Sequence, residues 1–532
     1  MKKNNLSHTV LFLCTVIVIS SPMFVHHSAR ASTKLMGGKL IISGYLKETA
    51  FIRTAMLDRE KRYHDSNLDF LMTAGLLEAL YTLQDSPDLT VRLFGGVKYW
   101  WEKSHYFDQD YRRSIPHRDR KDWTHPRSFA DDIITEAYVD IQKGPWQVKI
   151  GKQIVIWGQL NLERVADVVN PLDFRRGYPG INAWEDVKRG LWMIRVLYQS
   201  TLPGTLLFET IFNPGDYKNM QLLFEAAQPG SLAWNNRFFD PEHQKFGIYH
   251  WQREKWSRDA PGWSLKDNWE LGFRVRGNTY GVDWTVLYWN ARDDGPVAHP
   301  GRINDFTMPF ITSGIRTAMQ GKWVPPPDWP DYRVFYFKRY QTVGGTAQYY
   351  AQPLWDTVWR LEWFYEIGRP LNKGTGGDQG AIYSWTRRNI LGIALQCAKT
   401  LEIPWFTKSR IGCNAMLDFD ITYGWEKIFN HDHDLVTSDR GRHYRDSVND
   451  VLTCFMRQSM CHGKFMFIFV GNYFLRTNKW QAIPILSYVF PGGHWRFDTG
   501  FAAHGGANRE YAKSYYSSPS RDRVVLRLRY EF

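Results

Sequence analysis

The most distinctive group of ionisable side chains in this sequence lies between Gly151 and Gly180. Acids and arginines are interspersed there with apolar residues, so the segment carries charges and also apolar side chains that can pack against the rest of the protein. Cations opposed to anions around a narrow passage would select solutes by charge. An extracellular cap or an ordinary packing loop would use the same composition. We predict a pore constriction formed by Glu163, Arg164, Asp167, Asp173, Arg175 and Arg176.

A second set of charges alternates with apolar residues along extended segments. Side chains alternate between the two faces of a strand, so these charges share one face. The set holds about ten cations and about ten anions, as expected for the polar interior of a membrane barrel. Because the signs balance, the set does not predict an anion-selective pore, and cross-strand ion pairs are the alternative reading. From this set we select as candidate lumen-lining residues Arg92, Arg274, Arg276, Arg360, Glu362, Asp418, Asp420, Arg527 and Arg529.

Metal and catalytic motifs are weak. His431 and His433 occupy alternate positions beside two aspartates, but a metal site needs three or four converging ligands. A solvated loop explains the pair better. The sequence contains no G-x-S-x-G, P-loop or dinucleotide-binding motif. We therefore expect no metal, no cofactor and no catalytic residues.

Cysteine positions allow disulfides. Cys14 lies in the leader, which leaves Cys397, Cys413, Cys454 and Cys461 in the mature chain. Four cysteines can pair in three ways, and an oxidising compartment permits them to do so. We expect Cys397–Cys413 and Cys454–Cys461, because each pair flanks one short connection.

The elements that position these residues are strands. In the last nine residues, Val524 to Phe532, apolar and aromatic side chains alternate with charged ones, and similar alternation recurs in residues 91–102, 269–276, 357–366 and 417–423. Such alternation predicts strands with one apolar and one charged face. We count about 18 segments, within a range of 14 to 18, which predicts an all-β, transmembrane antiparallel β-barrel over residues 32–532. The terminal Tyr530 and Phe532 resemble the closing strand that serves as an insertion signal in outer-membrane barrels.

The connections between these segments alternate in length. Short connections at 144–145, 201–204, 278–279, 351–353 and 491–493 alternate with long ones. Barrels of the bacterial outer membrane join short periplasmic turns to long outer loops in this way. Both termini are then expected on the periplasmic side. Residues 400–413 are long for a turn and residues 476–479 are short for an outer loop. The long connections are predicted at 102–132, 157–189, 213–267, 291–340, 367–387, 427–449 and 504–521.

The N-terminus has the features of a secretory signal peptide. Lys2 and Lys3 precede an apolar stretch over residues 10–19, and Ala-Arg-Ala at 29–31 is a cleavage site. We expect residues 1–31 to be removed. The formal net charge of +13 then indicates anionic lipid headgroups or solutes as partners, and no nucleic acid, because the protein leaves the cytoplasm.

Several motifs resemble a known family. They are G-K-Q-x-x-x-W-G at 151–158, V-N-P-L-D at 169–173, Arg360-Leu361-Glu362 before Gly368-Arg369-Pro370, and the terminal aromatic strand. Together they resemble a large proteobacterial outer-membrane family catalogued as a domain of unknown function and, more weakly, alginate-export porins. The resemblance implies an outer-membrane barrel that acts as a channel or exporter, with no catalytic residues.

The expected function is therefore an outer-membrane channel, in a Gram-negative bacterium, for passage or export of a polar or amphipathic solute. Aromatic residues make up 16% of the chain, as interfacial girdles would require, and the mean hydropathy of −0.44 argues against helical spans. Expected partners are outer-membrane lipid, the barrel-assembly machinery and periplasmic transport components. The alternatives are an enzyme at the barrel rim, a secreted soluble polysaccharide-binding β protein, and a barrel sleeve around an electron-carrying partner.

Overall fold

The computed structural model describes the chain from Ser32 to Phe532 with internal gaps. The described residues are 32–54, 68–104, 133–160, 165–172, 188–200, 206–218, 261–295, 297–298, 335–352, 356–374, 382–402, 416–436, 445–461, 463–476, 478–505 and 522–532. The predicted signal peptide, residues 1–31, lies outside them.

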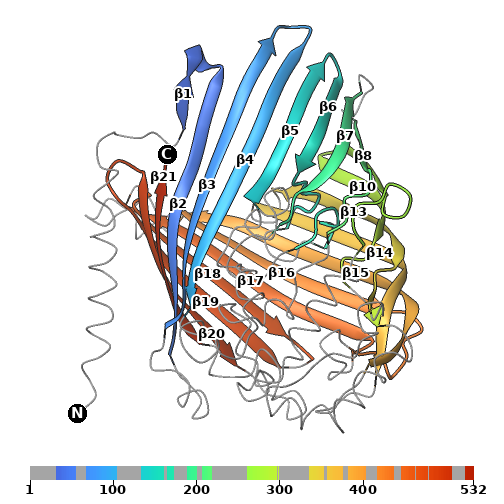
Figure 1. The fold of residues 1–532 in the computed structure, drawn as a ribbon. Helices are drawn as coiled ribbons and strands as arrows, with labels where there is room; N and C mark the ends of the chain where they lie inside the picture. Colours follow the sequence, from blue (N-terminus) through green and yellow to red (C-terminus); the bar gives the residue numbers. More distant parts are fainter. Residues whose placement is uncertain are drawn as a thin grey trace, which may run out of the picture.

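Antiparallel strands make up most of the described chain (Figure 1). One three-residue 3-10 helix, η1 (Met36–Gly38), joins β1 to β2. The strands are β1 (Thr33–Leu35), β2 (Leu40–Arg53), β3 (Leu68–Asp85), β4 (Thr90–Ser104), β5 (Ile134–Lys143), β6 (Trp146–Gln153), β7 (Leu191–Gln199), β8 (Leu207–Asn213), β9 (Glu270–Thr279), β10 (Val282–Arg292), β11 (Val297–Ala298), β12 (Phe335–Tyr336), β13 (Arg339–Ala351), β14 (Thr357–Gly374), β15 (Ile382–Glu402), β16 (Met416–Ile428), β17 (Val448–Met460), β18 (Phe465–Phe474), β19 (Lys479–Val489), β20 (Trp495–Gly505) and β21 (Arg523–Glu531).

The sheet closes on itself, which confirms the predicted barrel. Each strand pairs with its neighbours along the chain, and β2 pairs with both β3 and β21. Eighteen strands form the closed wall. At the seam, the last residue, Phe532, exchanges two backbone hydrogen bonds of 3.1 Å with Gly44 of β2. The short β1 pairs with residues 40–42 of β2, which precede Gly44. β11 and β12 form a separate two-stranded ribbon.

The two faces of the wall differ as the alternation predicts. On the outward face, large apolar side chains such as Leu46, Leu77 and Val286 are about half exposed, as lipid contact requires. On the inward face, polar side chains such as Gln396 and Thr453 are fully buried. This is the reverse of a soluble sandwich, in which polar faces point to solvent.

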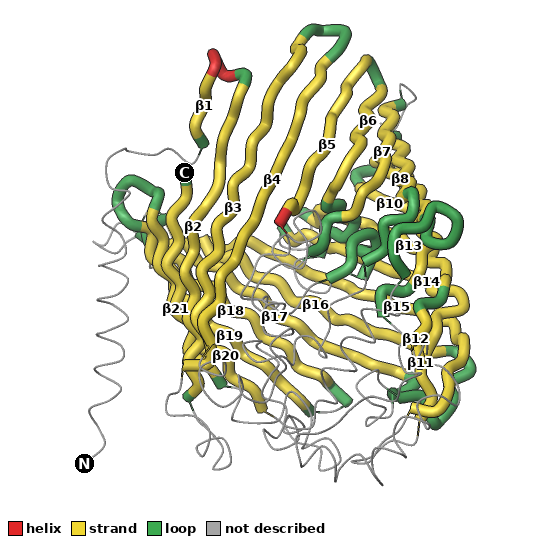
Figure 2. Tube along the Cα trace, in the orientation of Figure 1, coloured by secondary structure: helices red, strands yellow, loops and turns green. Residues whose placement is uncertain are grey.

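The connections alternate in length, as predicted (Figure 2). β2 starts and β21 ends at the end of the barrel that carries the short turns. The two predicted exceptions are present, at 403–415 and 475–478. The turn predicted at 278–279 lies two residues later, at Tyr280-Gly281, where both residues have positive φ as a primed hairpin turn requires.

β14 and β15 are longer than the sequence predicts. Most of the expected connection 367–387 is strand, and only 375–381 separate the two elements. The cause is a β-bulge between Glu366 and Arg369, where Gly368 has φ of 67°. A bulge inserts a residue and interrupts the two-residue period, so the regular alternation ends before the strand does.

Among the described residues, no helix is both long enough and apolar enough to cross a bilayer.

Candidate functional site

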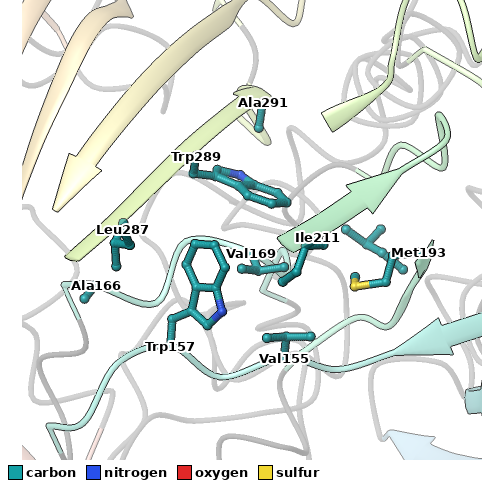
Figure 3. Packing of buried hydrophobic residues seen from close by; sticks show 10 residues of the cluster. Val155, Trp157, Ala166, Val169, Met193, Ile211, Leu287, Trp289 and Ala291 are labelled. Carbon is teal, nitrogen blue, oxygen red and sulfur yellow. The ribbon is translucent and has the colours of Figure 1, made fainter. Parts of the chain in front are cut away.

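The chain leaves the wall after β6 and folds into the barrel (Figures 2 and 3). Residues 154–172 form this segment, which we call the inner loop; its residues 161–164 lie outside the described part. Its apolar side chains, which include Val155, Trp157 and Val169, pack on inward-facing residues of β7, β8 and β10. The rings of Trp157 and Trp289 meet edge to face with centroids 5.7 Å apart. Burial of these side chains holds the inner loop against one side of the wall.

A glycine in β9 makes room for this aromatic pair. Gly272 lies on the inward face opposite Trp289, and a Cβ built on it would overlap the Trp289 ring and lie 2.8 Å from Trp157. No real Cβ makes such contacts without displacing the neighbouring rings. The packing of the inner loop therefore depends on the missing side chain at position 272.

Polar bonds tie the base of the inner loop together. Asn170 accepts a 2.6 Å hydrogen bond from the Val155 amide and donates to the carbonyl oxygens of Gln153 and Arg189 at 3.1 and 2.9 Å. Asn170 is buried, so these bonds satisfy backbone groups that water does not reach. Asn170 belongs to the V-N-P-L-D motif. The motif therefore has a structural role in shaping the inner loop.

Glu362 fastens the inner loop to a distant strand. Its carboxylate, on the inward face of β14, accepts hydrogen bonds from the amides of Gln159, Leu160 (2.8 Å) and Ala166 (3.0 Å). The residue is completely buried. Hydrogen bonds to an ionised acceptor are about twice as strong as neutral ones. Glu362, predicted to line the lumen, lies on the inward face but is covered by the inner loop.

Glu209 of β8 is a second buried carboxylate that contacts the inner loop. It accepts hydrogen bonds from Arg195 (2.6 Å), Arg274 (Nε, 2.7 Å) and the Trp157 indole (3.3 Å). The Arg274 guanidinium also lies 5.3 Å from the Trp157 ring. Glu209 was not among the predicted residues, although Phe208, Thr210 and Phe212 alternate with Glu209 and Ile211 as in the other predicted strands.

Of the predicted constriction residues, only Asp167 is described. It forms an ion pair of 2.6 Å with Lys188 and accepts a 3.1 Å hydrogen bond from the Trp157 amide. Both side chains of the pair are almost fully buried, so Asp167 holds the inner loop in place through contacts that solvent does not reach. Lys188 was not among the predicted residues. Glu163, Arg164, Asp173, Arg175 and Arg176 lie outside the described residues.

The other predicted lumen residues lie on the inward face, and several take part in ion pairs or hydrogen bonds. Arg360 donates to Gln348 and Gln396, each at 2.7 Å. Asp418 pairs with Arg457 at 2.6 Å. The remaining members are Arg92 opposite Asp140, Arg276 opposite Thr285, Asp420 opposite Phe455, Arg527 within 3.6 Å of Asp498, and Arg529 within 2.8 Å of Glu531.

The cysteine pairing Cys454–Cys461 is wrong. No disulfide joins these residues, and they lie seven positions apart along β17 and its end. At the rise of a strand this corresponds to about 23 Å, far beyond the reach of a disulfide. β17 runs through the connection that the sequence analysis placed between them. Cys397 is a thiol, and its predicted partner Cys413 lies outside the described residues.

The two histidines lie in the connection after β16. The His431 ring is hydrogen-bonded with the Arg445 carbonyl oxygen, and His433 is exposed. Asp432 pairs with Arg388 and Lys373, and the hydrogen bond from Arg388 is the main cause of the lowered pKa of Asp432. Within the described part of the chain, no three His, Cys, Asp or Glu side chains gather as a metal site would require.

Comparison with solved structures finds outer-membrane proteins of similar shape. The Acinetobacter baumannii protein OccAB1 is 7% identical, with a TM-score of 0.47 over 94% of this chain and 97% of its own. Salmonella typhi OmpF, in complex with daunomycin, is 11% identical with a TM-score of 0.41 over 94% and 100%. Pseudomonas aeruginosa OpdK, with vanillate, is 9% identical with a TM-score of 0.42 over 93% and 98%.

Comparison with curated proteins gives no match. The family model described as protein of unknown function (DUF1302) matches residues 59–462, which include the inner loop, Glu209 and Glu362. This range is most of the chain, and it agrees with the family resemblance of the motifs at 151–158 and 169–173. The chain therefore belongs to the DUF1302 family.

Proposed function

We propose that this protein is an outer-membrane channel whose inner loop narrows the passage for a polar or amphipathic solute. The observation that carries the proposal is the attachment of the inner loop to β14 through Glu362. A barrel of 18 strands is wide enough for an aqueous lumen, so a segment fastened across part of the interior sets the free cross-section. The apolar outward face supports placement in a bilayer.

The interior offers a polar route beside the inner loop. Arg496, Arg529 and Glu531 on β20 and β21 are all partly exposed on the inward face. The inner loop contacts β7, β8, β10 and β14, which are different strands of the wall. A solute would pass between the inner loop and these partly exposed charges. Charged side chains of both signs favour polar solutes over purely apolar ones.

Insertion of the barrel is part of the proposal. Tyr530 and Phe532 project from the outward face of the closing strand, and Phe532 pairs with Gly44 at the seam. We assign them as the signal read by the barrel-assembly machinery, with the short-turn end on the periplasmic side. Periplasmic transport components would then meet the short turns.

Single-channel conductance in a planar bilayer tests the proposal. The folded wild-type protein is expected to conduct, and Glu362→Ala is expected to raise the conductance and its noise, because three inner-loop amides lose their acceptor. Asp140→Ala is the matched control, since Asp140 is an inward carboxylate of β5 that accepts a 2.8 Å hydrogen bond from Gln147 instead of from the inner loop. Folded wild-type protein without conductance would overturn the channel, and equal conductance of Glu362→Ala and wild type would overturn the role of the inner loop.

A further inference from the structure

Four cations gather on the outward face of the barrel, at the end that carries the long connections. They are Arg292, Lys338, Arg339 and Arg387, and we call them the outer basic cluster. Arg292 and Arg339 are register partners on β10 and β13, and Lys338 immediately precedes β13. Arg292 has the same parity in β10 as Val286, which is 51% exposed on the outward face. Alternation along the strand therefore directs Arg292 and its partner away from the lumen.

Arg387 belongs to the same face. It lies in β15, where it has the parity of the exposed, outward-facing Leu395. Ile367, 41% exposed, pairs with Gln341, and Arg339 lies two residues farther along β13 toward the long-connection end. The cluster therefore lies just beyond the apolar surface that faces lipid. This is the level at which lipid headgroups meet a membrane barrel.

The guanidinium groups of the cluster are held by backbone carbonyl oxygens. Arg292 donates to Asp267 O at 2.7 Å, Arg339 to Trp269 O at 2.7 Å, and Arg387 to Arg339 O at 2.9 Å. None of the four cations forms an ion pair with any carboxylate among the residues that the structure describes. The guanidinium groups are therefore held in place, while the described acid Glu270 acts on Arg339 without forming an ion pair with it.

Two other cations at the same end provide a contrast. Arg388, next to Arg387 but on the inward face, pairs with Asp432, and Lys373 lies 3.1 Å from Asp434. Inward cations at this end are thus matched with acids, whereas the outward ones are not. Among the described residues, the acids that pair with cations at this rim therefore lie on the inward face, and the outer basic cluster is open to a negatively charged ligand.

Aromatic rings frame the outer basic cluster. Lys338 Nζ lies 4.4 Å from the Tyr336 ring centroid and 5.0 Å from that of Trp385, and Arg339 lies 4.4 Å from that of Trp269. Tryptophan and tyrosine favour the membrane interface, because one part of the ring system is apolar and another part is polar. The cluster thus combines cations for a headgroup with rings that sit between headgroup and acyl chain.

A cavity of about 530 Å³ opens beside Arg292 and Lys338. Its volume falls in the range of small-molecule sites. Asn268, 1% exposed, lines it, and the Asn268 Oδ1 acceptor has no hydrogen-bond partner; nor does the buried Arg292 Nε donor. An unpaired buried polar group is destabilising, so both atoms favour a ligand that supplies an acceptor to Arg292 and a hydroxyl or amide donor to Asn268.

The surroundings of Lys338 oppose its positive charge. Burial lowers the pKa of Lys338, and the nearby Arg387 and Arg292 lower it further. An anion bound between these side chains would offset that repulsion.

We infer that the outer basic cluster binds the phosphate-bearing headgroup of an anionic lipid in the outer leaflet. Phosphate oxygens would accept from Arg292, Lys338 and Arg387, and a headgroup hydroxyl or amide would donate to Asn268. The acyl chains would then run along the exposed apolar surface near Ile367. The inference rests on the proposed orientation of the barrel, with its long connections outward, and not on conduction.

Lipid binding by the detergent-solubilised full chain tests the inference. The probes are lipid A with two phosphates, the same lipid after dephosphorylation, and inorganic phosphate alone. The Lys338→Ala/Arg387→Ala double variant is compared with Lys373→Ala/Arg388→Ala, which removes two cations that pair with acids. Heat-modifiable migration on a gel verifies that each variant is folded.

Wild type is expected to bind the phosphorylated lipid, and the cluster variant about thirtyfold more weakly, since it lacks two cations that each contribute about 1 kcal/mol near a headgroup. The control variant should bind like wild type. Equal binding of dephosphorylated lipid, an unchanged cluster variant, or equal stabilisation by inorganic phosphate would overturn the assignment to a lipid headgroup. Loss of lipid with normal conductance would leave the proposed channel intact, and loss of conductance with retained lipid would leave this site intact.

Discussion

Two sides of the barrel interior use charge differently. On the loop-bearing wall, formed by β7, β8, β10 and β14, Glu209 and Glu362 are buried and each accepts three or more hydrogen bonds. On the partly exposed wall, formed by the short-turn ends of β16, β17, β20 and β21, the pairs Asp418–Arg457 and Arg529–Glu531 keep roughly a third or more of each side chain exposed. The same alternating pattern thus produces buried carboxylates that hold the inner loop on one wall and solvent-accessible charges on the other.

The energetic reason lies in solvation. A buried ion whose partner is removed is left in a medium that does not hydrate it, which is strongly destabilising. An exposed pair is screened by water and contributes little. The loop-bearing wall is therefore expected to determine stability, and the partly exposed wall to determine which solutes pass.

The largest effect is expected from Glu209→Ala. The substitution leaves Arg274 buried and unpaired, and it should lower the free energy of unfolding by about 3–5 kcal/mol. Urea unfolding in lipid vesicles, followed by gel migration, measures the change. Asp418→Ala on the partly exposed wall is the control, with an expected loss of about 1 kcal/mol or less. Similar losses for the two variants would remove the distinction between the walls.

Gly272→Ala should have an intermediate effect. The added methyl group would collide with Trp289 and Trp157, and overpacking of this kind costs about 1–3 kcal/mol. The same unfolding assay applies, and the conductance should also change as the inner loop shifts. Gly95→Ala is the matched strand control, because a Cβ there would meet no atom within 4 Å. A neutral Gly272→Ala would show that the aromatic pair does not position the inner loop.

On the partly exposed wall, Arg529→Ala should alter selectivity with little effect on stability. The change removes one of the partly exposed cations beside the proposed route and should move the reversal potential in a salt gradient toward cation preference. The unfolding midpoint should stay close to that of wild type. A reversal potential identical to that of wild type would place the solute route elsewhere.

The smallest effect concerns pH and the connection that contains Asp432. A carboxyl whose pKa is lowered in the folded protein adds stability above its ordinary pKa of 3.8, and that stability is lost as the pH falls through the folded value. Acidification below about pH 4 should therefore loosen the contact with Arg388 and Lys373. The probe is the Val436 amide, which donates a 2.9 Å hydrogen bond to Asn372 O. After correction for intrinsic rates, its hydrogen exchange should become faster on acidification in wild type. In Asp432→Asn the corrected rate should not depend on pH. An equal acid response in both proteins would assign the effect to another group.

The sequence analysis predicted the wall of the barrel better than its interior. The barrel, the strand number and the alternation of connection lengths are confirmed, because each depends on a pattern that repeats within a few residues. The prediction was wrong where a local feature breaks the pattern, as at the bulge before Arg369, and where β17 continues between Cys454 and Cys461. Five of the six constriction residues lie outside the described part of the chain, so that site stays a prediction.

The two-residue period of side chains along a strand is a local property, and for this reason the sequence alone determined which face of each strand is apolar and which is charged. Only the tertiary structure decided how those charges are used. Glu362 reaches amides about two hundred positions away in the chain, and Asp167 pairs with Lys188 across the inner loop. Closure of the barrel, and the folding of a segment inside it, bring these groups together and leave the outer basic cluster without an acidic partner among the described residues. Such meetings depend on positions around the whole barrel, which no short stretch of sequence contains.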